Sequence, residues 1–128
     1  MHTTNYFNTF ISAAEDCPVT TGEVPPEKMP KTAVQIQYEL ISKHPYEFTS
    51  DDVIYAANGE RRGISCDEFF SKGQACFRSS PLTKRYGWGV HSDADGKIAI
   101  YPMESPQYDA YATNPDLKQL KGMRSKRV

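Results

Sequence analysis

Two β-rich runs on either side of a tight turn constrain the fold of this chain more than any other feature. The first run is RYGWGVHS, the second is KIAIYPM, and Asp95 and Gly96 lie between them. Glycine accepts the positive φ that hairpin turns require, and the runs have the composition and alternation of strands. The sequence therefore predicts a β-hairpin over residues 85–103.

Helical patterns dominate the first half of the chain. Residues 32–44, TAVQIQYELISKH, fit a strand by alternation, but their length, their broad apolar face and the stop at His44-Pro45 favour a helix. This helix places Gln37 within its apolar face, where a buried amide needs partners. The residues TSDD at 49–52 have the spacing of a helix N-cap and predict a second helix over about 50–58. The residues SCDE at 65–68 have the same spacing and predict a short third helix that ends near Gly73.

The expected fold is a single α+β domain over residues 1–128, in which N-terminal helices are followed by a small antiparallel sheet that contains the 85–103 hairpin. Residues near 75–79 are expected to form another strand, and residues 6–13 and 117–124 are candidates for further strands. Ser105 with Pro106 predicts a short helix after the hairpin. The proline-rich residues 15–31 predict an ordered surface loop.

Charge is divided unevenly along the chain. The net charge is −1, yet residues 1–60 hold nine acids against three bases and residues 61–128 hold seven acids against twelve bases. Such a chain can attract its own acidic half, an acidic partner or an anionic ligand. The small net charge argues against a dedicated nucleic-acid binder, because those proteins carry a strong positive excess.

Several classes of protein are not indicated. No apolar run approaches the length of a membrane span, and the first residues lack the pattern of an export signal. The cysteines, Cys17, Cys66 and Cys76, are odd in number and form no C-x-x-C pair, so a reducing cytoplasm is the expected location. The histidines have no metal-ligand spacing and no nucleotide motif is present, so neither a metal nor a cofactor is expected.

One stretch, RSSPLTKRYGWGVHSD at residues 78–93, combines bases, hydroxyls and aromatic rings. Fixed charge and backbone amides around a proline turn suit a phosphate or carboxylate, so we expect non-enzymatic binding of a small anionic ligand at a basic and aromatic pocket. The candidate ligand-binding residues are Arg78, Ser79, Ser80, Lys84, Arg85, Tyr86, Trp88 and His91. In a simpler interpretation, Tyr86, Trp88 and Val90 are core residues, and Gly87 and Gly89 leave room for a covering helix.

Two alternatives remain open from the sequence. The first is an enzyme in which His91 acts as acid or base and Arg78 or Arg85 clamps the substrate; His91 is the one candidate catalytic residue. The second is a protein or RNA interaction module that uses the basic C-terminal tail. Its bases are Lys118, Lys121, Arg124, Lys126 and Arg127. The sequence does not indicate an oligomeric state.

Four segments together resemble a known family. They are YFNTFISAAEDCPVTTGEVPP, HPYEFTSDDVIYAA, DEFFSKGQACFRSSPLTKRYGWGVHSD and KGMRSKR. The chain resembles a family of small, stand-alone bacterial proteins classed as a domain of unknown function. This resemblance implies a bacterial, cytosolic, single-domain protein, and it brings no activity, cofactor or catalytic residue.

Overall fold

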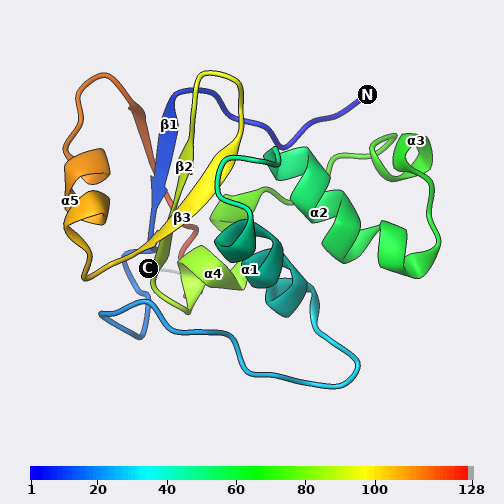
Figure 1. Ribbon diagram of the computed structural model, residues 1–128, viewed down its shortest axis with the longest axis horizontal. Coiled ribbons are helices and arrows are strands. Elements are labelled where there is room, and N and C mark those ends of the chain that lie inside the picture. Colours follow the sequence, from blue (N-terminus) through cyan, green and yellow to red (C-terminus); the bar gives the residue numbers. More distant parts are fainter. Residues whose placement is uncertain (127–128) are drawn as a thin grey trace.

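A four-stranded sheet forms the centre of the protein in the computed structural model, which describes residues 1–126 (Figure 1). The strand order is β3-β2-β1-β4, so the N-terminal strand β1 lies in the interior of the sheet. The strands are β1 (Thr9–Ser12), β2 (Trp88–Ser92), β3 (Ile98–Pro102) and β4 (Lys118–Lys121).

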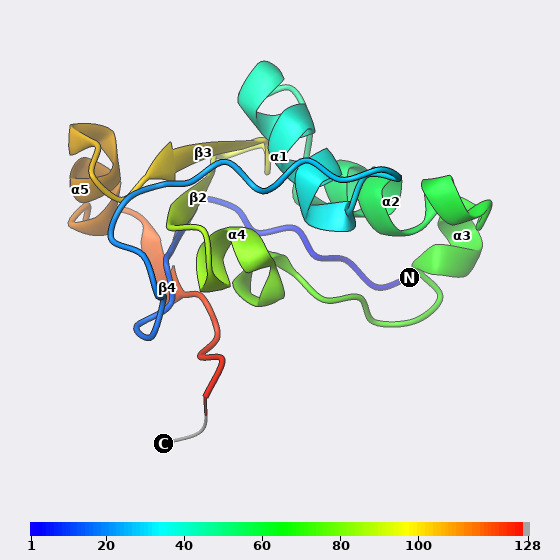
Figure 2. The ribbon, with the colours of Figure 1, turned by 90° about the horizontal axis from the view of Figure 1, so that it is seen from below.

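Helices cover both faces of this sheet. Helix α5 packs on one face, against β1 and β3, and α1, α2 and α4 lie on the other (Figures 1 and 2). The α-helices are α1 (Ala33–Lys43), α2 (Ser50–Asn58), α3 (Cys66–Phe69), α4 (Pro81–Lys84) and α5 (Pro106–Ala112); the 3-10 helices are η1 (Glu60–Arg62) and η2 (Phe77–Ser79). None of the helices within residues 1–126 has the length and apolar character needed to cross a bilayer.

The predicted hairpin is confirmed. Strands β2 and β3 pair antiparallel, with Val90 opposite Ile100. The turn is held by the Asp93 carboxylate, whose Oδ1 accepts from the backbone N–H groups of Asp95 and Lys97, both at 2.9 Å. Gly96 has a φ of 79°, which is the left-handed conformation expected of a glycine in this turn.

The predicted helix starts are also present. Thr49 and Asp52 form a reciprocal capping box at the start of α2. The Ser65 side chain accepts from the Glu68 N–H at α3, and the Ser105 side chain accepts from the Tyr108 N–H at α5. Each cap satisfies a backbone donor that the first helical turn leaves without a partner, so these boundaries follow from local chemistry.

The prediction of an antiparallel sheet is wrong, because the sheet is mixed. Strand β1 pairs antiparallel with β2 but parallel with β4, with Ile11 opposite Leu120. Residues 6–13 and 117–124 do supply strands, as expected. Because β3 also runs parallel to β1, the chain crosses from β3 to the far edge through α5, and such helical crossovers join parallel strands.

The strand expected near residues 75–79 is also wrong, since Phe77–Ser79 form the 3-10 helix η2. Ser80 caps α4 directly afterwards, and Pro81 occupies its first turn. The Thr83 hydroxyl then donates to the Phe77 carbonyl at 2.7 Å and holds the segment in a tight turn. Local capping outweighs the β propensity of this segment.

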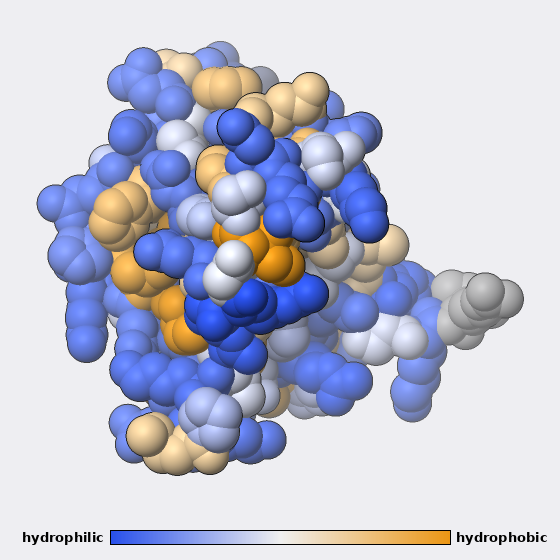
Figure 3. Space-filling model, turned by 90° about the vertical axis from the view of Figure 1, so that its right-hand side faces the viewer, coloured by the Kyte–Doolittle hydropathy of each residue, from blue (hydrophilic) through white to orange (hydrophobic). Residues whose placement is uncertain are grey.

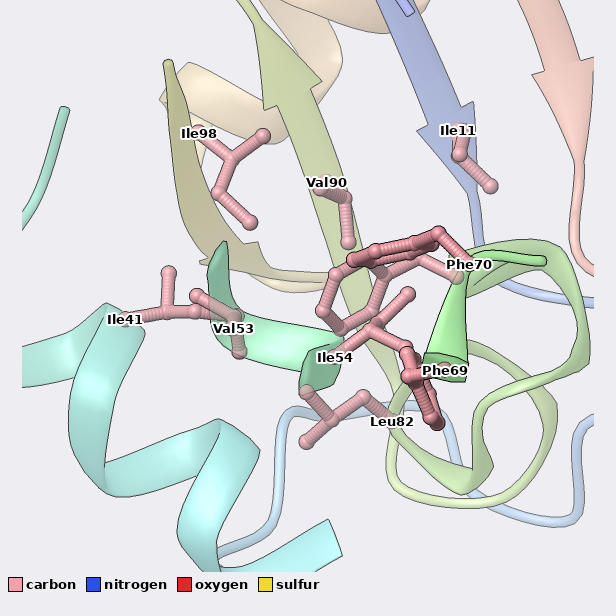
Figure 4. Packing of buried hydrophobic residues seen from close by; sticks show 10 residues of the cluster. Ile11, Ile41, Val53, Ile54, Phe69, Phe70, Leu82, Val90 and Ile98 are labelled. Carbon is pink, nitrogen blue, oxygen red and sulfur yellow. The ribbon is translucent and has the colours of Figure 1, made fainter. Parts of the chain in front are cut away.

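The main core lies between the sheet and the helical layer. Figure 4 shows Ile11, Val90 and Ile98 pointing from β1, β2 and β3 towards the helices. The helices and the segments that follow them contribute Ile41, Val53, Ile54, Phe69, Phe70, Phe77 and Leu82, all buried. These apolar side chains hold α1, α2, α3 and α4 against one face of the sheet.

The opposite face of the sheet is closed by aromatic packing. Phe10 of β1 is fully buried, and its ring centroid lies 5.2 Å from that of Tyr108 and 5.9 Å from that of Tyr111, both on α5. Gly89 of β2 leaves the space that these rings occupy: a Cβ there would lie 2.7 Å from Tyr108 Cε2. The absence of a side chain at residue 89 therefore allows α5 to approach the sheet.

We expect Gly89→Ala to lower the free energy of unfolding by about 1–3 kcal/mol, because the added methyl group overpacks the contact between Phe10 and Tyr108. Chemical denaturation monitored by circular dichroism measures this change. Gly73→Ala is the matched control, since the nearest atom to its new Cβ is His2 Nδ1 at 3.8 Å. Equal stability of Gly89→Ala and the wild type would contradict this account of α5 packing.

Candidate functional site

A hollow opens in the helical layer where the first turn of α1 meets the end of α2 and the start of α4. Its volume is about 350 Å³, which is at the lower end of the range for small-molecule sites. We call it the Gln37 pocket. It is lined by Thr32, Ala33, Val34, Gln37, Ile54, Asn58, Gln74, Ala75, Cys76, Ser79, Ser80 and Pro81.

A chain of hydrogen bonds orients the polar groups of the Gln37 pocket. Ser80 Oγ donates to Gln37 Oε1 at 2.8 Å, and Gln37 Nε2 donates to Asn58 Oδ1 at 3.3 Å. Gln37 and Ser80 are buried, so each of these contacts offsets the cost of removing a polar group from water. The chain fixes the Asn58 side chain with its oxygen towards Gln37.

Several hydrogen-bond donors at the pocket have no acceptor among the described residues. Within residues 1–126, no acceptor is bonded to Asn58 Nδ2 or to the backbone N–H groups of Ala33 and Val34 in the first turn of α1. Arg62 Nη1 donates to the Asn58 carbonyl at 3.3 Å, which brings a guanidinium to this end of α2. The lining residues themselves are uncharged, so no carboxylate opposes this positive character.

A second group of chemically active side chains lies on the α5 face of the sheet. Tyr46 Oη is 2.7 Å from His91 Nδ1 and 2.8 Å from Tyr101 Oη, and 3.4 Å from Tyr111 Oη. The His91 and Tyr111 rings are stacked, with centroids 4.2 Å apart. We call Tyr46, His91, Tyr101 and Tyr111 the phenol–imidazole cluster.

Burial sets the protonation of this cluster. It raises the pKa of Tyr46 and Tyr101, so both phenols are protonated at neutral pH. Burial also lowers the pKa of His91 below its ordinary value, an effect that the nearby Asp93 carboxylate opposes. At neutral pH the imidazole is therefore uncharged and can accept a hydrogen bond from Tyr46.

Tyr46 reaches the cluster through an unusual backbone. Its φ is 59°, in the left-handed region that non-glycine residues rarely adopt. The conformation is held because the Tyr46 N–H donates to the Ile98 carbonyl at 2.8 Å while the hydroxyl contacts His91. These two bonds attach the loop between α1 and α2 to strands β3 and β2.

The candidate residues from the sequence do not converge on one pocket. Ser79 and Ser80 line the Gln37 pocket in the helical layer. Trp88 faces the same layer, where its ring lies 5.4 Å from that of Tyr38 and its Nε1 donates to the Glu23 carbonyl at 2.8 Å. His91 lies on the opposite face of β2, against Tyr111, so the sheet separates it from Ser80.

The other basic and aromatic candidates lie outside both sites. Arg78 Nε donates to the Lys121 carbonyl at 2.7 Å, at the end of the outer strand β4. Lys84 ends α4, and Arg85 is exposed directly after it. The backbone of Tyr86 contacts the proline-rich loop, where its carbonyl accepts from the Glu23 N–H at 2.8 Å.

Sequence reasoning missed the residues that connect each site. The apolar position of Gln37 indicates a buried amide that needs partners, but no pattern in the sequence identifies Asn58 as one of them. Tyr46, Tyr101 and Tyr111 come from a loop, from β3 and from α5. No sequence spacing relates these three residues, because the sheet and the α5 crossover bring them together.

The basic tail makes contacts within the chain. Lys121 Nζ lies 3.3 Å from Glu15 Oε1, and Arg124 Nη1 lies 4.0 Å from Glu15 Oε2. The Asp16 carboxylate accepts from the backbone N–H groups of Ser125 and Lys126. Part of the positive charge of the tail therefore faces the chain's own acids, and Arg127 lies outside the described residues.

The fold and the two sites define a class: a mixed α+β domain with a polar pocket in its helical layer and no arrangement, among the described residues, of three His, Cys, Asp or Glu side chains suited to a metal. The chain belongs to the family of unknown function DUF6157, whose match covers residues 1–128. Neither a curated protein nor a solved structure matches the chain.

The lowered pKa of His91 predicts a specific dependence of stability on pH. The unfolded chain binds a proton at His91 more readily than the folded protein does. The contribution of neutral His91 to the free energy of unfolding is therefore complete above about pH 6.5 and is lost as pH falls through the folded pKa. We expect His91→Phe, whose ring can still stack on Tyr111, to lose less stability between pH 7 and pH 5 than the wild type.

Urea unfolding at the two pH values measures this difference, and the exposed His2→Gln is the control that should behave as the wild type. An equal or greater loss of stability in His91→Phe would contradict the inferred effect of burial on His91.

Proposed function

We propose that this protein binds a small anionic ligand, without catalysis, in the Gln37 pocket. The observation that supports the proposal most is the open amide of Asn58, which the hydrogen-bond chain from Ser80 through Gln37 holds in place. A donor fixed in this way loses little conformational freedom when it binds an acceptor.

The surroundings of Asn58 favour an anion over a neutral ligand. The backbone N–H groups of Ala33 and Val34 belong to the first turn of an 11-residue helix and carry its partial positive charge. Arg62 adds a full positive charge next to Asn58. The ligand class that these groups suit is a small carboxylate or phosphate compound.

The Gln37 pocket favours binding over catalysis. Its lining residues include no histidine, carboxylate or amine that could transfer a proton, and Cys76 is their one thiol. The enzyme alternative, in which His91 acts with Arg78 or Arg85, lacks support because His91 faces α5 while Arg78 is bonded to Lys121. The tail alternative is weakened by the contacts of Lys121 and Arg124 with Glu15.

The proposal includes a setting in the bacterial cytoplasm. The reducing compartment is supported by the cysteines, since Cys17, Cys66 and Cys76 are all free thiols, and the bacterial origin rests on the resemblance of the sequence alone. Free thiols persist in a reducing compartment, whereas proteins of oxidising compartments use paired cysteines.

We expect one or more small carboxylates or phosphorylated metabolites to raise the melting temperature in a thermal-shift screen. Asn58→Asp replaces the open amide with an oxygen acceptor of nearly the same shape and adds a negative charge. It should weaken binding of the best compound at least about tenfold in calorimetric titration, because a hydrogen bond to a charged group contributes about 1.5–3 kcal/mol.

Two controls locate the effect. Gln107→Glu adds the same charge to exposed α5 and should bind as the wild type, and so should Lys84→Ala, which alters the basic stretch outside the pocket. The proposal fails if no anion stabilises the protein, or if Asn58→Asp binds the best compound as tightly as the wild type does.

A further inference from the structure

A second hollow lies between α1 and α2 and shares no lining residue with the Gln37 pocket. Its volume is about 440 Å³. We call it the α1–α2 groove. It is lined by Leu40 of α1, Phe48 of the connecting loop, Asp52, Tyr55 and Ala56 of α2, and Glu60 of η1.

The walls of the groove are apolar and partly exposed. Leu40, Phe48, Tyr55 and Ala56 are each only half-buried, although the helices that carry them bury other residues in the core. The Tyr55 hydroxyl donates to the Ile64 carbonyl at 2.8 Å, so Tyr55 lines the groove with its aromatic ring while its hydroxyl is bonded elsewhere. Figure 3 shows hydrophobic residues grouped among hydrophilic ones on the side where α2 and α3 lie.

Acidic groups stand at both ends of the groove. Asp52 lies in the first turn of α2 and Glu60 lies just beyond its last turn. Glu60 lies eight positions after Asp52 in the sequence, which corresponds to about 12 Å along a helix axis. Asp52 Oδ2 accepts from the Thr49 N–H at 3.0 Å, whereas the Glu60 carboxylate has no hydrogen-bond or ion-pair partner within residues 1–126.

No base compensates these acids inside the groove. Its six lining residues include no lysine or arginine. The bases that follow Glu60 are directed to backbone oxygens: Arg61 donates to the Lys31 carbonyl at 2.6 Å and Arg62 to the Asn58 carbonyl. An occupant with basic groups at both ends therefore gains favourable electrostatic contacts, in addition to burial of its apolar side chains.

We infer that the α1–α2 groove docks an amphipathic helix of a partner protein, which presents apolar side chains on one face with a lysine or arginine at each end of that face. The separation of Asp52 and Glu60 matches about two turns of such a helix, and an apolar groove between two helices is a recurrent receptor for this kind of segment. This inference does not depend on the proposed ligand function, because the two hollows share no residue.

The probe is a synthetic helical peptide of about 16 residues with leucines at positions i+3 and i+4 and lysines at positions i and i+7, which lie on one face of the helix. We expect saturable binding to the full chain in fluorescence anisotropy. The same peptide with glutamates in place of both lysines should bind at least about tenfold more weakly. Equal affinity of the two peptides, or no saturable binding of the lysine peptide, would overturn the inference.

Two substitutions in the protein locate the site. Ala56→Arg fills the groove and should abolish binding, and Glu60→Lys, on an exposed side chain, should weaken it at least about tenfold. Ala110→Arg on exposed α5 and Glu27→Lys in the proline-rich loop are the matched controls and should bind as the wild type does. Unchanged binding by both groove variants would place the peptide elsewhere and contradict the inference.

Analytical ultracentrifugation of the unmodified protein tests the competing occupant, which is a second copy of this chain. We expect a single monomeric species at all concentrations. A concentration-dependent dimer that Ala56→Arg abolishes would show that the groove is covered by another copy, and would overturn the assignment to a partner helix.

Discussion

The pairing of β1 with two distant strands holds the sheet and both of its covering layers together. Residues 9–11 pair with 90–92, and residues 9–12 also pair with 118–121, so nearly the whole chain must be in place before β1 is enclosed. Ile11 faces the helical core and Phe10 faces α5, and both are fully or almost fully buried. A change in β1 is therefore transmitted to both layers at once, because successive residues of a strand point to opposite faces.

This arrangement also explains why the molecule has separate chemical regions. The Gln37 pocket belongs to the helical layer, and the phenol–imidazole cluster belongs to the α5 layer, with the sheet between them. One turn of helix α1 supplies side chains to three different regions. Ile41 packs in the core, Gln37 lines the Gln37 pocket and Leu40 lines the α1–α2 groove. A helix with an apolar face this broad can bury one part of that face and leave another part open for binding.

The starts of α2, α3 and α5 and the hairpin turn depend on residues close together in the sequence and were predicted correctly, whereas features that depend on distant residues were not. Asp95 and Gly96 mark the hairpin turn as neighbours in sequence, and Thr49 with Asp52 marks a helix start within four residues, so the sequence predicts both features. The parallel pairing of β4 was not, because its direction follows from the α5 crossover. The expected pocket was assembled from neighbours in sequence such as Ser80 and His91, yet the chain between them passes from α4 into a strand that sends His91 to the other face.

Local sequence chemistry sets where α2, α3 and α5 begin and where the hairpin turns, since caps and turn residues act over a few neighbouring residues. The direction of β4, the bonds of Gln37 to Asn58 and Ser80, and the contacts among Tyr46, His91 and Tyr111 arise from the packing of distant segments. The physical reason is that these contacts join segments far apart in the chain. Their geometry is set by how helices cross a twisted sheet, and no local pattern of residues encodes that crossing.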